Sequence, residues 1–298
     1  MRAAALALSL VFLFQVACTD QKIKSIEPRT VRLTSDPGED RSPSWSPDGS
    51  RILFSSDRNG DYEIYSITGD GTGLTRITDN PGLDDSPAWG PSGTQFVFQS
   101  ERNGTKGLWT AAWPGGKLQL LLEDPSPELL PDWSPDGRWI AFTSERDGNP
   151  ELYRVEVSSG RTERLTTNPY RDLWPRHFPD GASLLFFSRR GTEGEHDDLY
   201  RLDLIDQTVT RLTDHPTHHD FAPDVSPNGQ LIVAGMSDRA ADRRELVVFN
   251  RDGNVVTRFA TGNHRVFHPV WSPDGDAILY AARVREGEQA DLYIGQAP

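Results

Sequence analysis

Short apolar runs recur along the chain, and each is bounded by segments rich in Pro, Gly, Asp and Asn. The six clearest runs cover residues 52–54, 96–98, 140–142, 184–186, 231–233 and 278–280. Runs of this length between turn residues predict short β-strands. Because the apolar positions are consecutive, we expect both faces of each strand to be covered.

A second pattern precedes each apolar run and repeats with a period near 44 residues. Its clearest copies read Pro-Ser-Trp-Ser-Pro-Asp-Gly at 43–49 and Pro-Asp-Trp-Ser-Pro-Asp-Gly at 131–137, and four variants begin at Pro87, Pro175, Pro223 and Pro269. In the Ser-Pro-Asp-Gly part, Pro fixes φ, Asp bonds to its own backbone and Gly accepts a left-handed conformation, which predicts a tight turn. Six copies with this period predict an array of six small sheets.

Each repeat contains the sequence signals of four strands. The Pro-x-Trp segment is the first, the apolar run is the second, a Leu-Tyr type segment is the third, and a segment ending in Leu-Thr or Ile-Thr is the fourth. The sixth repeat reaches Ile294 without a fourth strand, whereas residues 30–34 read as a fourth strand that precedes the first repeat. We therefore predict an all-β, six-bladed β-propeller of four-stranded antiparallel blades over residues 30–298, closed by the N-terminal strand, which completes the last blade.

The first 17 residues have a different character. Arg2 is followed by an apolar stretch at 3–14, which is too short for a transmembrane helix, so residues 1–17 are predicted to be an export signal. Cys18 is the single cysteine and stands where bacterial lipoproteins carry their lipid, with 18–29 as a lipidated or flexible linker. Gln15 occupies a position where the lipidation motif usually has an apolar residue. Plain secretion, with Cys18 incidental or removed, therefore stays open beside a periplasmic or membrane-anchored lipoprotein.

The charge balance limits the classes of partner. The chain has 31 Lys and Arg against 44 Asp and Glu, a formal net charge of −13. Binding to nucleic acid needs clustered basic residues that neutralise phosphates, so we expect no nucleic-acid partner. After residue 17 no apolar span reaches the roughly 20 residues of a transmembrane helix, so membrane contact is expected only through a lipid anchor on Cys18.

The repeat as a whole resembles a known propeller family. Its Pro-x-Trp-Ser-Pro-Asp-Gly core, the Phe-x-Ser-x-Arg segment after it, the Leu-Tyr strand and the Leu-Thr ending are similar to the TolB-like, or WD40-like Pro-Asp-Gly, repeat over residues 30–294. TolB proteins are periplasmic components of a cell-envelope complex, and their propeller binds a peptidoglycan-associated lipoprotein. The resemblance implies an envelope propeller that binds another protein or a peptide. TolB proteins also carry an N-terminal α/β domain, which we do not find in this sequence, and the repeat occurs in peptidases and lyases as well.

Acidic residues recur three positions before the repeat Pro in five of the six copies. They are Asp40, Asp84, Glu128, Asp172 and Asp220. We expect them to form a partial ring at one mouth of the central channel, where carboxylates could bind a cation or a basic partner segment. Arginines recur at 58, 102, 146, 190 and 239, in the turn between the second and third strands. Because acid and arginine repeat together, we favour a ring of ion pairs that belongs to the framework.

Function is expected where the repeat breaks. In the fourth copy His177 replaces the Trp, and other histidines gather just before the fifth and sixth copies. The predicted binding face comprises Trp174, His177, His215, His218, His219, Asp220, His264 and His268. Histidines gathered with Asp220 could ligate a transition metal, although we favour contacts with a partner or with water.

Two functions follow from these features. The favoured one is an exported cell-envelope propeller that acts as a non-enzymatic protein-binding scaffold without a cofactor. It rests on the export signal, the uniform repeats and the lack of a Gly-x-Ser-x-Gly nucleophile motif. The alternative is a metal-assisted lyase or hydrolase on acidic sugars that uses the channel-mouth histidines around a cation. Convergence of His177, His219 and His268 on one point would favour this alternative.

Overall fold

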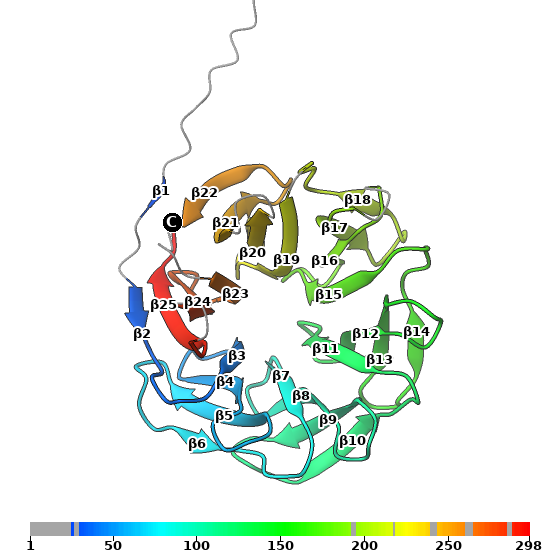
Figure 1. Ribbon diagram of the computed structural model, residues 1–298. Helices are drawn as coiled ribbons and strands as arrows, with labels where there is room; N and C mark the ends of the chain where they lie inside the picture. Colours follow the sequence, from blue (N-terminus) through cyan, green and yellow to red (C-terminus); the bar gives the residue numbers. More distant parts are fainter. Residues whose placement is uncertain are drawn as a thin grey trace, which may run out of the picture.

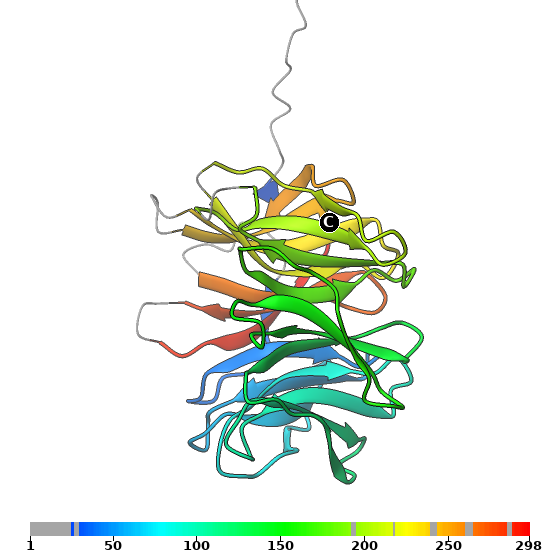
Figure 2. The same ribbon diagram turned by 90° about the vertical axis from the view of Figure 1, so that its right-hand side faces the viewer.

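Six small antiparallel sheets form a ring in the computed structural model, which describes residues 25–26, 30–191, 195–216, 218–238, 243–259, 265–284 and 288–298 (Figure 1). The blades follow one another round the ring in chain order, and Figure 2 shows the same ring from its side. The predicted all-β, six-bladed propeller is therefore confirmed. Cys18, His264 and the predicted export signal lie outside the described residues. Within the described part, no helix is long and apolar enough to span a membrane.

Each blade presents its first strand to the centre of the ring (Figure 1). From blade one to blade six these innermost strands are β3 (Asp40–Trp45), β7 (Asp84–Trp89), β11 (Glu128–Trp133), β15 (Asp172–His177), β19 (His218–Val225) and β23 (Arg265–Trp271). The second strands are β4 (Arg51–Ser56), β8 (Gln95–Ser100), β12 (Trp139–Ser144), β16 (Ser183–Ser188), β20 (Leu231–Asp238) and β24 (Ala277–Arg283). The apolar runs found in the sequence lie on these second strands and are buried, except for the partly buried Leu231, as predicted for covered blades.

The third and fourth strands complete each blade toward the rim. The third strands are β5 (Glu63–Thr68), β9 (Gly107–Ala112), β13 (Glu151–Glu156), β17 (Asp198–Asp203), β21 (Arg243–Asn250) and β25 (Asp291–Gln296). The outer strands are β6 (Thr75–Arg76), β10 (Leu118–Leu122), β14 (Thr162–Arg164), β18 (Val209–Arg211), β22 (Val255–Phe259) and, for blade six, β2 (Thr30–Arg32).

Blade six is completed by the N-terminal strand, as predicted. β2 pairs antiparallel with β25, so that Val31 lies opposite Ile294. The Leu33 amide continues the pairing by donating to the Leu292 carbonyl at 2.8 Å. A feature that the sequence did not predict precedes this closure: β1 (Ser25–Ile26) pairs in parallel with β22 and adds a fifth strand to the rim of blade five.

The repeated tryptophans pack between blades, as their place in the motif indicates. Trp45, Trp89, Trp133 and Trp271 each belong to an apolar cluster that two neighbouring blades share. Trp133, for example, is 6% exposed and packs in one cluster with Val97 of blade two and Ile140 of blade three. The tryptophans therefore hold consecutive blades together through buried apolar surface.

Closure of the ring can be tested at a single residue. Hydrogen-bonded pairs alternate along an antiparallel ladder, so the Leu33–Leu292 bond implies that the Val31 amide donates to Ile294. Replacing Val31 with Pro removes this donor from a strand and should cost about 2 kcal/mol or more, which lowers the melting temperature by roughly 4 °C or more. Val31→Thr, which keeps the amide and a β-branched side chain, is the matched control. Equal melting temperatures of the two variants would contradict closure by β2.

Candidate binding site in the central channel

A β-bulge interrupts the innermost strand of every blade at the same position. The pairing register shifts between the residues on either side of it in all six strands. The bulged residues have a positive φ of 47–62°, although none is glycine: Ser42, Ser86, Leu130, Trp174, Ala222 and His268. A proline follows each of them. Bulges redirect side chains, and here they do so at one level of the channel in all blades.

Five of these bulged residues line one pocket in the channel. Its space is about 320 Å³, including the part open to solvent, and it is lined by Ser42, Pro43, Ser86, Pro87, Leu130, Pro131, Trp174, Arg176, His268 and Val270. We call this cavity the channel pocket. It joins residues from blades one, two, three, four and six. Its wall combines two serines with an aromatic side chain, an imidazole and a guanidinium.

The aromatic part of the wall is a pair of rings in contact, tilted against each other. The rings of Trp174 and His268 lie 4.9 Å apart at an angle of 35°. Nδ1 of His268 accepts the backbone amide of Ser42 at 3.0 Å, which places the imidazole proton on Nε2. Burial lowers the pKa of His268 to about 4, so the imidazole is neutral at pH 7. The pair therefore presents an uncharged, flat surface to the pocket.

The adjacent guanidinium is held between two carboxylates. Arg176 lies 3.1 Å from Asp132 and 3.8 Å from Asp224. Asp132 also accepts both the backbone amide and Nδ1 of His177 at 2.8 Å. Burial opposes ionisation of Asp132, but the His177 hydrogen bond and the Arg176 charge outweigh it and lower the pKa of Asp132. Burial raises the pKa of Asp224 to about 6. The positions of Arg176 and His177 are thus fixed before any ligand arrives.

The predicted acidic ring is placed inside the blades. Asp40, Asp84, Glu128, Asp172 and Asp220 are all 0% exposed. Four of them pair with the turn arginine of their own blade: Arg58 with Asp40, Arg102 with Asp84, Arg146 with Glu128 and Arg190 with Asp172. Asp220 accepts the Thr213 hydroxyl at 2.5 Å, and Arg239 lies outside the described residues. In these four blades, each carboxylate forms an ion pair with an arginine of the same blade.

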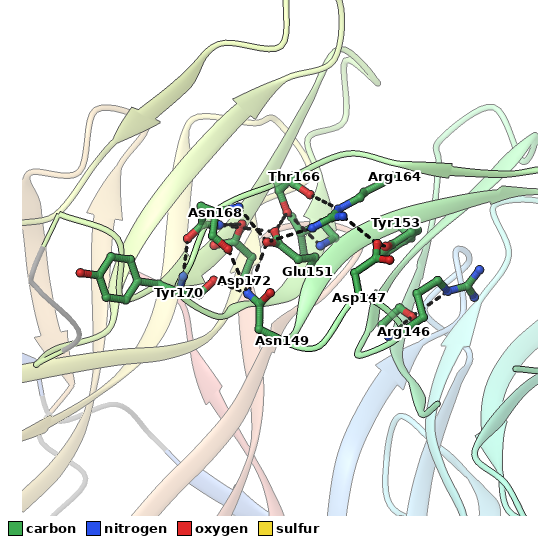
Figure 3. A network of polar contacts seen from close by, with 12 residues as sticks. Arg146, Asp147, Asn149, Glu151, Tyr153, Arg164, Thr166, Asn168, Tyr170 and Asp172 are labelled. Atoms are coloured by element: carbon green, nitrogen blue, oxygen red, sulfur yellow. Dashed lines mark hydrogen bonds and ion pairs between the residues drawn. The ribbon is translucent and has the colours of Figure 1, made fainter. Parts of the chain in front are cut away.

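The structure contains a second set of buried carboxylates that the sequence reasoning did not identify. Glu151 accepts the Thr166 hydroxyl at 2.6 Å and the Asn168 amide at 2.8 Å (Figure 3). The Asn168 side chain donates to Asp172 of the next blade at 2.9 Å, so the network crosses from blade three to blade four. The signal was present as an acid before the Leu-Tyr strand with an Arg-x-Thr segment after it. Glu63 with Arg76 and Asp198 with Arg211 repeat this pattern.

The predicted histidines occupy separate places. His219 lies against Asp197 at 3.0 Å, and its ring is 5.7 Å from that of His196. His215 contacts the ring of His218 at 6.1 Å and lies 4.0 Å from Asp220. His177 contacts Asp132, and His268 contacts Ser42. The imidazoles of His177, His219 and His268, which were named for a metal site, therefore have different partners and do not form a common site. Among the described residues, no group of three His, Cys, Asp or Glu is placed to hold a metal ion.

Comparison with known proteins identifies related sequences and folds. A family model described as the TolB beta propeller domain matches residues 19–123 and 74–275. A putative TolB from Agrobacterium tumefaciens is similar with a TM-score of 0.68 and 23% identity, over 89% of this chain and 93% of that one. An oligogalacturonate lyase solved with manganese has a TM-score of 0.63 and 16% identity, over 93% and 96% of the two chains. At these identities the structures show a common fold alone.

A curated relative matches a smaller part of the chain. It is an uncharacterized peptidase of Bacillus subtilis, YuxL, which is 32% identical over 77 residues. The match covers 26% of this chain and 12% of that protein.

The buried Asp220 predicts a pH dependence of stability. Burial, with a smaller effect of the nearby Asp198, raises its pKa from 3.8 to about 7 against the opposing effect of the Thr213 hydrogen bond. Between these two pH values the folded chain holds a proton that the unfolded chain releases. The contribution of Asp220 to the free energy of unfolding should therefore fall as pH rises from about 4 to about 7, by up to about 1.4 kcal/mol per pH unit, and change no further above that range.

Asp220→Asn should make this dependence less steep in urea unfolding curves measured across the same pH range, because the variant lacks the Asp220 proton, whereas Asp224 still contributes. Asp276→Asn, at an exposed position, is the control and should keep the wild-type slope. An unchanged slope in Asp220→Asn would contradict the assignment.

Proposed function

Since the chain belongs to the TolB β-propeller domain family, we propose that it is an exported cell-envelope protein that binds another protein or a peptide at the channel pocket and has no catalytic role. The observation that carries this proposal is the Trp174–His268 pair beside Arg176. Blades one and two have only serine at the bulge where blades four and six have these large side chains. Since serine suffices at this bulge in two blades, a side chain as large as that of Trp174 is not needed to build a blade.

The chemistry of the channel pocket suits recognition of a polypeptide. Tryptophan and arginine are the residues that most often dominate the free energy of protein–protein binding, above all in concave, partly desolvated places. Leu130, Val270 and three prolines supply apolar surface around them. Arg176 is already neutralised by Asp132 and Asp224, so we expect apolar contact with Trp174 to contribute more than charge.

The arrangement of Ser42 and His268 supports binding over nucleophilic catalysis. The Ser42 hydroxyl lies 3.5 Å from Nδ1 of His268, at the long limit of a hydrogen bond. Nδ1 already accepts the Ser42 backbone amide at 3.0 Å. It is therefore unavailable to take a proton from the hydroxyl, as a catalytic base must.

The proposal predicts a partner whose capture depends on Trp174. The tagged full chain, its Trp174→Ala variant and a control Ile205→Ala variant would each be used to capture proteins from an envelope extract. Ile205 is 84% exposed in a turn of blade four and does not line the channel pocket. We expect a protein retained by the wild type and by Ile205→Ala to be at least tenfold depleted with Trp174→Ala. Identical capture by all three proteins would contradict the channel pocket as the binding site.

The same proposal includes attachment of the mature chain through lipid on Cys18. The support is the sequence of residues 1–18, and a diacylglyceryl group supplies the two acyl chains that stable anchoring requires. The wild type should therefore fractionate with membranes and carry an N-terminal mass that includes lipid, whereas Cys18→Ser should be found in the soluble fraction. A wild type that is soluble and has no lipid mass would show plain secretion instead.

A further inference from the structure

The rim of blade two departs from a rule that the other five blades follow. In each of those blades an arginine on the outer strand pairs with an acid on the third strand. The pairs are Arg32–Asp291, Arg76–Glu63, Arg164–Glu151, Arg211–Asp198 and Arg258–Glu245. These arginines place a charge on the outermost strand, and charges on edge strands discourage pairing with other chains.

Blade two lacks both members of this pair. Leu120 lies opposite Trp109, as Arg76 lies opposite Tyr65 in blade one, so leucine occupies the arginine position. Gly107 begins the third strand where blades one and three have Glu. A Cβ atom at Gly107 would come within 2.9 Å of the Leu122 carbonyl oxygen, so a larger residue does not fit there. The two changes go together, because a buried acid without its arginine would be destabilising.

The result is an uncharged, partly exposed edge. β10 has the sequence Leu-Gln-Leu-Leu-Leu, and Leu120 in its middle is 39% exposed. It is longer than the outer strands of blades one, three, four and six, which have two or three residues. In the part of the chain that the structure describes, no strand pairs with its outer edge.

Blade five shows that an edge of this length accepts another strand. β22 also has five residues, and β1 pairs along its outer side. β10 and β22 are thus outer strands of equal length. The chain covers β22 with its own strand β1, whereas β10 has no such cover among the described residues.

We propose that the β10 edge binds the β10 edge of a second copy of this chain, with the two strands antiparallel and related by a twofold axis. The segment reads Lys117-Leu-Gln-Leu-Leu-Leu-Glu123. When two copies pair antiparallel about Leu120, Lys117 of each lies opposite Glu123 of the other, and Leu118 lies opposite Leu122. Opposite charges facing each other stabilise a strand pair, whereas a parallel arrangement would oppose like charges.

The charged ends of the segment are available for this pairing. Lys117 and Glu123 are both exposed, and the Glu123 contacts within its own chain are with the neutral side chains of Thr105 and Asn103. The symmetric contact uses the same surface on both copies, so it closes at two chains and does not continue into a fibre.

The strength of the contact should be modest. Two five-residue strands bury less surface than a stable interface, so a weak, concentration-dependent dimer is expected. A register shift between Leu120 and Leu122 on the side facing β9 also twists the strand. Each copy has a net charge of −13, so the repulsion between copies has to be screened by salt for the dimer to form.

Sedimentation equilibrium of the full chain over a concentration series, at physiological salt, tests the proposal. We expect the wild type to dimerise reversibly and Leu120→Arg to remain monomeric, because arginine restores the edge charge of the other blades. Leu74→Arg is the matched control, since Leu74 is 42% exposed and lies outside β10. A wild type that stays monomeric up to about 1 mM, or a dimer unaffected by Leu120→Arg, would overturn the proposal.

Charge reversal tests the antiparallel register. Lys117→Glu or Glu123→Lys alone opposes like charges at both ends and should weaken dimerisation about tenfold. The double variant K117E/E123K restores opposite charges and should return the dissociation constant to near the wild-type value. Melting temperatures check that each variant is folded. If the double variant dimerises no better than the single ones, the antiparallel register about Leu120 is wrong.

Discussion

The pairing of β2 with β25 is the contact on which the rest of the molecule depends. It joins the two ends of the described chain into a ring, because Val31 lies opposite Ile294. Only in a closed ring can the first and last blades meet in the channel, where the Ser42 amide reaches His268 across 226 positions of the sequence. The channel pocket, which takes residues from five blades, therefore exists only when the ring is closed.

Residues that recur in most blades build the framework of this protein, whereas residues that differ between blades give single blades their own chemistry. The buried acid–arginine pairs recur from blade to blade, so their charges neutralise each other within the common framework. Two places depart from that framework: the Trp174–His268 pair in the channel and Leu120 with Gly107 at the rim. One is concave and aromatic, the other is an uncharged strand edge, and these chemistries suit different partners.

The fold could be predicted because its signals are local and repeated: the Pro-Asp-Gly turns, the apolar runs and the unpaired strand at each end. The channel pocket could not, since it depends on a bulge at a residue whose type differs between blades, and the proline after it does not by itself indicate a bulge. Trp174 and His268 were singled out as breaks in the repeat, but Arg176 was not, although it lines the same pocket. The three histidines named for a metal site turn to different partners: His219 to Asp197, His177 to Asp132 and His268 to the Ser42 amide. β1 was missed because two residues give no periodic signal.

The bulged residues connect the channel pocket with the closure of the ring. In blades two, three and four, the amide of the bulged residue donates a hydrogen bond to a second-strand side chain of the preceding blade. The acceptors are Ser55, Gln99 and Thr143. The corresponding residue before blade one is Ala281, which has no side-chain acceptor. His268 takes its place and accepts the Ser42 amide. The same imidazole contacts the ring of Trp174, so the aromatic wall of the channel pocket is held in position by the seam where the ring closes.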